Sequence, residues 1–201
     1  MDPRSLLARP RLYSLFRALV GRDGARAVYA REHLRAQPGE RVLDIGCGTG
    51  DILQFLPPVR YVGYDVSPRY IERARRRFGG RGEFHCAAVD DGLPEPAGSC
   101  DLVIAHGVLH HLDDDAARTL FRVAQRALKP GGRLVTFDGC FTGEQSAAAR
   151  LFLSLDRGRH VRSRDAYERL ARSAFEQVHS FVRHDLLRIP YTHLIMECGK
   201  A

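Results

Sequence analysis

A glycine-rich turn between a buried strand and a helix constrains the fold of this chain more than any other feature. Residues 41–45 form a short apolar run that stops at Gly46-Cys47-Gly48-Thr49-Gly50. Such a run, ended by glycines, is typical of a strand buried in a parallel sheet. The glycines allow a tight turn and a close approach of a ligand to the backbone, because they carry no Cβ atom.

Strands and helices alternate after this turn, which predicts an α/β fold with a mostly parallel sheet and helices on both faces. We expect strands at 60–64, 83–86, 101–105 and 133–138, and helices at 50–56, from Ser67, and at 114–128. Two helices over 11–36 precede this core, and helices at 144–156 and 163–174 follow it. Two β-like runs close the chain at 178–187 and 191–198. Only residues 188–190 separate them, so they should pair antiparallel.

Two spaced aspartates indicate which ligand the turn binds. Asp65 ends the next strand, where an acid can accept hydrogen bonds from the hydroxyls of a ribose. A dinucleotide loop has the pattern G-x-G-x-x-G, whereas this loop has G-x-G-x-G followed by Asp51. Asp51 and Asp44 would both repel a pyrophosphate. They suit a cationic ligand without phosphate, and S-adenosylmethionine, with its sulfonium and ammonium groups, is such a ligand.

Four segments resemble successive motifs of the class I S-adenosylmethionine-dependent methyltransferases. They are VLDIGCGTG, YVGYDVS, CDLVIAHGVLHHL and LKPGGRLV, in the family's order and at its usual distances, over about residues 40–140. The resemblance implies a Rossmann-like, seven-stranded sheet of order 3-2-1-4-5-7-6 with one antiparallel strand. It also implies one domain over 1–201: a helical lid (1–38, an analogy at the level of the fold, with Tyr13 and Phe16), a cofactor-binding core (39–140), and acceptor-side helices with a closing strand pair (141–201).

The resemblance also implies the cofactor-binding residues. Asp44 should anchor the methionyl amino group, directly or through water, and Asp65 should hold the ribose. The remaining expected contacts are the backbone of Gly46, Cys47 and Gly48, adenine packing by Val66, and a border of the methionine and the reacting methyl formed by Ala105 and His106.

The adenine amine is expected near residues 87–91, where this chain departs from the family. The usual Asp position, measured back from Leu93-Pro94, falls on Val89. Either Asp90 or Asp91 reaches the adenine through a shift of one or two residues, or only backbone contacts remain; we favour Asp90.

The sequence indicates less about the residues that would bind the methyl acceptor. His106 is the candidate general base by position, or it only lines the pocket. Of His110 and His111, at least one should be structural, bonded to a backbone group. Asp138 ends the fifth strand at the same edge, and Tyr191 and His193 share a face of the last strand, bordering the acceptor or packing beneath helices. Arginines of segment 156–164 suit an anionic group on the acceptor, or are solvated. We expect no metal.

Composition narrows the remaining classes of function. The formal charge of +7 comes almost wholly from arginines spread along the chain, and this does not favour a nucleic-acid partner. The five cysteines form no C-x-x-C pair and should be reduced. With no apolar stretch near 20 residues and no secretory signal at the N-terminus, we expect a cytoplasmic protein without a membrane span.

The sequence therefore predicts in-line methyl transfer to a small-molecule acceptor. An RNA or protein methyltransferase is the alternative, although neither an Asn-Pro-Pro-Tyr nor a Pro-Cys motif occurs. A non-catalytic protein that kept the fold is a third hypothesis.

Overall fold

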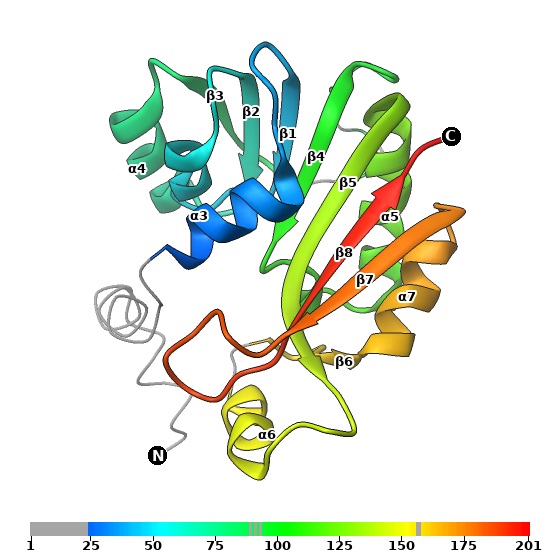
Figure 1. Cartoon of the computed structure of the whole chain (residues 1–201). Coiled ribbons are helices and arrows are strands. Elements are labelled where there is room, and N and C mark those ends of the chain that lie inside the picture. The colour runs from blue at the N-terminus through cyan, green and yellow to red at the C-terminus, as the bar shows by residue number, and fades with distance from the viewer. Residues whose placement is uncertain (1–23, 89, 91, 93, 156–157) are drawn as a thin grey trace.

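A computed structural model describes residues 24–88, 90, 92, 94–155 and 158–201 of the chain; residues 1–23, 89, 91, 93, 156 and 157 lie outside the described part (Figure 1). Tyr13 and Phe16, the two residues expected in an N-terminal lid, are among those outside it.

One mixed sheet runs through the molecule in the order β3-β2-β1-β4-β5-β8-β7. Its strands, from one edge to the other, are β3 (Gly82–Cys86), β2 (Arg60–Asp65), β1 (Arg41–Ile45), β4 (Cys100–His106), β5 (Leu128–Phe141), β8 (His193–Gly199) and β7 (Gln177–Arg183). All are parallel except β8, which runs antiparallel to both β5 and β7. The predicted order and the single reversed strand are confirmed. The last two numbers are one higher than predicted because a two-residue strand, β6 (Arg162–Ser163), also pairs with the end of β5.

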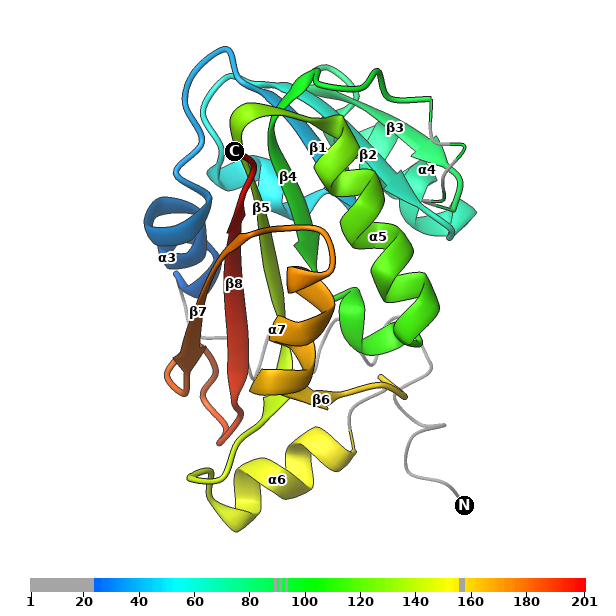
Figure 2. The ribbon, with the colours of Figure 1, turned by 90° about the vertical axis from the view of Figure 1, so that its right-hand side faces the viewer.

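Helices cover both faces of the sheet, as predicted. One face carries α3 (Ala25–Tyr29), the π-helical turn η1 (Ala30–Leu34), the 3-10 helix η2 (Asp51–Phe55) and α4 (Pro68–Phe78), whose apolar side chains form one buried cluster with the strands. The other face carries α5 (Asp114–Ala127) and α7 (Arg164–Arg172), side by side over a second cluster (Figure 2). The 3-10 turn η3 (Leu109–His111) and helix α6 (Ala147–Ser154) lie at the carboxyl ends of the strands.

Local sequence explains where these helices begin. The Ser67 side chain accepts a hydrogen bond from the Tyr70 amide, with Pro68 at the first helical position of α4. Asp113 caps α5 in the same way through the amide of Ala116, at 2.9 Å. The chain therefore enters both helices from the carboxyl edge of the sheet, the edge at which α/β proteins bind ligands.

Several boundaries differ from those predicted, among them the following three. The helical segment formed by α3 and η1 ends at Leu34, because Arg35 takes a left-handed conformation with φ 48°, before Pro38-Gly39 is reached. Strand β5 begins at Leu128 and passes through the Lys129–Gly132 segment that we expected to lie outside any strand. The connection between β7 and β8 spans 184–192 rather than 188–190. The strand ends early because Arg183 pairs with Asp185, and Leu186 turns into the core.

All five cysteines are free; four are buried and Cys86 is exposed. Among the described residues, none of the helices combines the length and apolar character that crossing a bilayer requires.

Candidate functional site

The loop after β1 is held tightly against its neighbours. Gly46, Gly48 and Gly50 all have positive φ, at 72°, 55° and 69°. The amides of Gly46 and Cys47 both donate to the carbonyl of Tyr64 at the end of β2, at 2.8 and 2.9 Å. A Cβ atom on Gly46 would collide with the side chain of Val108, so only glycine fits there. The backbone of this loop thus closes the carboxyl end of β1, and the loop carries no side chain of its own at Gly46 and Gly48.

Asp44 supplies a buried carboxylate oxygen that lacks a partner. The residue is 2% exposed, and its Oδ2 accepts a hydrogen bond of 2.5 Å from the Tyr61 hydroxyl. No group in the described part of the chain donates to Oδ1. Burial raises the pKa of this carboxyl to about 7. An unsatisfied buried oxygen of this kind calls for a donor from outside the protein, and a cation would favour its ionised form.

Asp65 lies at the end of β2 and ties two turns together. Its Oδ2 accepts from the Gly48 amide at 2.9 Å, and its Oδ1 accepts from the Ser67 amide at 2.8 Å. Each carboxylate oxygen has a second lone pair, so ribose hydroxyls can still donate to it. The next side chain, Val66, is apolar but 71% exposed. Such exposure is expected of a residue that packs against a bound flat group such as an adenine ring.

The adenine side is only partly described. Val89, the position that the family pattern indicates, and Asp91 lie outside the described residues. Asp90 is exposed, and its Oδ1 accepts from the Gly92 amide at 2.9 Å, so that carboxylate closes a turn. Contact of Asp90 with the adenine amine stays a prediction.

Ala105 and His106 end β4 beside this loop. Ala105 is fully buried. The His106 ring stacks on Phe137, with centroids 4.4 Å apart and planes 5° apart, and meets Tyr29 edge-on at 5.2 Å. His193, on β8, packs against the same Phe137 ring and against Tyr191, each with centroids 4.6 Å apart. His106 is thus part of an aromatic layer over the strand ends.

A histidine–aspartate pair lies on the other face of the same edge. Asp138, 3% exposed, accepts from the His110 amide at 3.1 Å, and its Oδ1 is 2.7 Å from His110 Nδ1. Burial raises the pKa of Asp138, and His110 opposes that rise. The His110 ring is thus bonded to a carboxylate side chain, and the expectation that at least one of His110 and His111 bonds to a backbone group stays a prediction. His110 and Asp138 were both singled out in the sequence, but nothing there indicated that η3 would bring them together.

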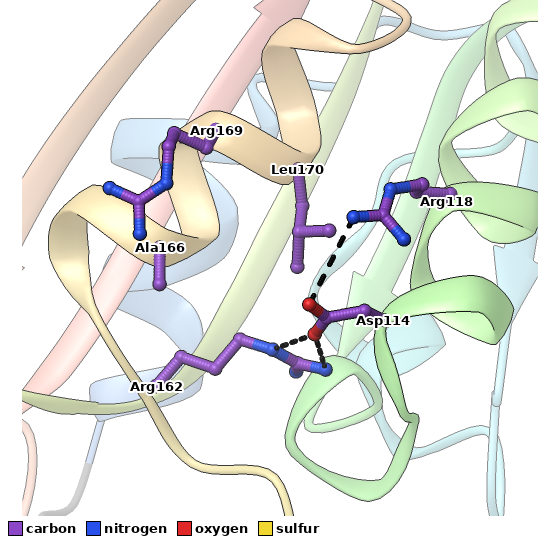
Figure 3. Close-up of a pocket in the computed structure, with 6 residues that line it drawn as sticks. All are labelled: Asp114, Arg118, Arg162, Ala166, Arg169 and Leu170. Carbon is purple, nitrogen blue, oxygen red and sulfur yellow. Dashed lines mark hydrogen bonds and ion pairs between the residues drawn. The ribbon is translucent and has the colours of Figure 1, made fainter.

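The arginines of segment 156–164 are mostly engaged within the protein. Arg162 binds Asp114 with two nitrogens, at 3.0 and 2.8 Å, and also donates to the carbonyls of Leu109, Leu112 and His160. Figure 3 shows this pair lining a pocket between α5 and α7, with Arg118 also directed at Asp114. Arg164 pairs with Glu168, Arg159 is exposed, and Arg157 lies outside the described residues. Arg162 therefore fastens η3 to the start of α7.

These features together fit S-adenosylmethionine. The unpaired oxygen of Asp44 suits an ammonium, Asp65 suits a ribose, Val66 suits an adenine, and the bare loop allows the close approach between them.

Known proteins agree with this assignment. Residues 42–132 match the family model of a methyltransferase domain. Malonyl-[acyl-carrier protein] O-methyltransferase of Hahella chejuensis is 34% identical over 137 residues, 66% of this chain and 48% of the relative. The chain thus spans less than half of that protein.

Two solved structures share the fold. Geranyl diphosphate C-methyltransferase from Streptomyces coelicolor, solved with S-adenosyl-L-homocysteine, has a TM-score of 0.70 at 18% identity, over 89% of this chain and 77% of that one. A putative methyltransferase in complex with the Haloferax volcanii Trm112 activator has a TM-score of 0.74 at 20% identity, over 100% and 99% of the two chains. Over residues 42–132 this chain is thus similar to methyltransferase domains, and its sheet and loop have the arrangement of the class I S-adenosylmethionine-dependent methyltransferases.

Proposed function

We propose that the protein transfers the methyl group of S-adenosylmethionine to a small-molecule acceptor by in-line displacement. The observation that carries the cofactor half is the unpaired, buried Oδ1 of Asp44, beside a loop tied to Asp65. The small acceptor is supported by relatives named for a malonyl group on a carrier protein and for geranyl diphosphate. The cytoplasmic location expected from the sequence stays a prediction.

The bound cofactor would supply an electrophilic methyl group on a sulfonium, already joined to a good leaving group. The protein then has to hold donor and acceptor in line and exclude water, which can account for much of the rate. The aromatic layer of His106, Phe137 and Tyr29 gives a dry wall for this purpose. Asp138, fixed by His110, offers a buried carboxylate on the acceptor side.

The test is a turnover screen of the full chain with labelled S-adenosylmethionine. One set of acceptors holds small carboxylates, thioesters either free or on a carrier protein, phenols and prenyl diphosphates; the other holds transfer RNA and ribosomes. We expect product release with a member of the first set, and its loss in the Asp44→Asn variant, whose shape is retained. Methylation confined to the second set would overturn the proposal in favour of the RNA or protein alternative.

A further inference from the structure

The hydroxyl of Tyr29, like Oδ1 of Asp44 and Oδ2 of Asp138, is a buried polar group near this edge to which no described residue hydrogen-bonds. Tyr29 ends α3 and is 1% exposed. Its ring meets His106 and Phe137 edge-on, with centroids 5.2 and 5.1 Å away, so packing fixes where the hydroxyl lies. No described residue hydrogen-bonds to it. A buried hydroxyl that makes no hydrogen bond destabilises the fold, so this one is best explained by a partner that the protein itself does not supply.

Tyr29 shares a face of the sheet with Asp44. Tyr29, Val42 and Tyr61 belong to one buried cluster, and Asp44, two residues after Val42 on β1, points to that side, where Tyr61 reaches it. The Asp44 charge acts on the Tyr29 hydroxyl: after burial, it is the largest cause that raises the pKa of Tyr29. Asp138, by contrast, alternates with Phe137 on β5 and faces the α5 side, where His110 holds it.

The two unpaired atoms are complementary. Asp44 Oδ1 can accept, and the Tyr29 hydroxyl can donate. An α-amino acid carries an ammonium and a carboxylate on one carbon, and S-adenosylmethionine ends in such a group. We propose that Tyr29 and Asp44 together bind the amino acid end of the cofactor, Tyr29 donating to its carboxylate and Asp44 accepting from its ammonium. The proposal depends on the proposed function only for the identity of the cofactor.

The site would therefore distinguish intact cofactor from fragments that lack either charge. Three ligands separate the contributions: S-adenosylhomocysteine, its analogue without the carboxyl group, and 5′-methylthioadenosine, which lacks both charges. Calorimetry would measure each against the wild type, Tyr29→Phe and Asp44→Asn. We expect Tyr29→Phe to weaken S-adenosylhomocysteine about tenfold and to leave the carboxyl-free analogue unchanged. Asp44→Asn should weaken both amine-bearing ligands but not 5′-methylthioadenosine.

Tyr167→Phe is the matched control. Tyr167 is equally buried, but its hydroxyl already donates to the Gly139 carbonyl at 3.2 Å, on the face that carries α7. Loss of the Tyr167 hydroxyl should leave the affinities for all three ligands unchanged. Thermal melting of each variant checks that it is folded.

The outcomes separate this inference from the proposed function. Equal loss for all three ligands in Tyr29→Phe would make Tyr29 a packing residue and overturn the inference, as would no loss at all. If Tyr29→Phe does not fold, the wild type decides: equal affinity for S-adenosylhomocysteine and its carboxyl-free analogue contradicts the inference. A wild type that binds none of the three ligands contradicts the proposed function instead.

Discussion

Asp44, Asp65 and Asp138 lie toward the carboxyl ends of β1, β2 and β5, and the surroundings of the three carboxylates differ. Asp65 accepts two backbone amides and so shapes the loop as well as offering lone pairs to a ribose. Asp138 is oriented by His110. Asp44 has one satisfied and one unsatisfied oxygen, and its pKa is raised to about 7. One aspartate thus accepts two backbone amides, one is oriented by a histidine, and one has a raised pKa beside the loop.

Cofactor affinity should rise with pH through about 7. The cause is Asp44, because only its ionised form pairs with an ammonium, and burial holds its pKa at about 7 in the free protein. Calorimetry with S-adenosylhomocysteine between pH 6 and 8, in buffers of different ionisation enthalpy, should show proton release on binding. 5′-Methylthioadenosine serves as the control, with a flat profile. A flat profile for both ligands would contradict the role given to Asp44.

The raised pKa of Asp44 also makes the stability of the fold depend on pH. A carboxyl whose pKa is higher in the folded than in the unfolded state stabilises the fold below its unfolded pKa, and this contribution is lost as pH rises through the folded pKa. The free energy of unfolding of the ligand-free protein should therefore fall between about pH 4 and 7. Asp44→Asn should remove this part of the slope.

Replacing Asp65 by alanine should weaken S-adenosylhomocysteine binding by about 1.5–3 kcal/mol, the range for hydrogen bonds to a charged group. Asp115→Ala, which removes a carboxylate that is 96% exposed on α5, is the comparison variant. Calorimetry on both, with circular dichroism to verify folding, gives the answer. An Asp65→Ala protein that is folded and binds normally would show that another group holds the ribose.

His106→Asn should lower kcat by less than about 100-fold, the low end for loss of a general base. The ring lies in an aromatic stack with Phe137 and Tyr29, which is a positioning environment. The measurement is kcat against pH at saturating cofactor, with an acceptor from the screen. A much larger loss, together with disappearance of a titration near neutral pH and unchanged cofactor affinity, would make His106 the base.

At the scale of the element, alanine substitutions in the loop between β1 and η2 should lower the stability of the fold by different amounts. Gly46 and Gly48 both have positive φ, but only at Gly46 would a new Cβ atom meet another side chain, that of Val108. Gly48→Ala should cost about 1–2 kcal/mol of stability from backbone strain alone. Gly46→Ala should cost more, because η3 must also shift. Chemical denaturation of both variants measures this difference, and equal losses would contradict the tight packing of Val108.

The elements also show what a sequence can and cannot predict. The strands from β1 to β4 follow from apolar runs ended by turn residues, and α4 and α5 follow from Ser67 and Asp113 caps. The 3-10 character of η2, the π turn of η1 and the early end of β7 depend on tertiary contacts, such as those of Arg183 and Leu186. Local patterns do not encode them.

The residues of the candidate site likewise fall into those that the sequence predicted and those that it did not. Asp44 and Asp65 were predicted because motif spacing places them at neighbouring strand ends. The His110–Asp138 bond and the buried hydroxyl of Tyr29 were not predicted, because each depends on how a turn or helix docks on a strand far away in the sequence.

At the scale of the whole molecule, the site should select its ligand by charge. S-adenosylmethionine and S-adenosylhomocysteine should bind and raise the melting temperature, whereas NAD should do neither, because the ionised form of Asp44 disfavours a pyrophosphate at the loop. Asp51 contributes less than its position in the sequence suggested, because Arg26 and Arg77 pair with it. Thermal melting with each ligand in excess tests this. Stabilisation by NAD alone would contradict the assignment of the cofactor.

The position of strand β8 in the sheet affects when this part of the protein can fold. It is the last strand in the chain, yet it lies inside the sheet, between β5 and β7. During synthesis, the edges of β5 and β7 therefore have no partner until residues 193–199 have emerged, and the growing chain carries two open edges of the kind that promotes aggregation. Folding of this half of the sheet should thus come late, only after residues 193–199 have left the ribosome.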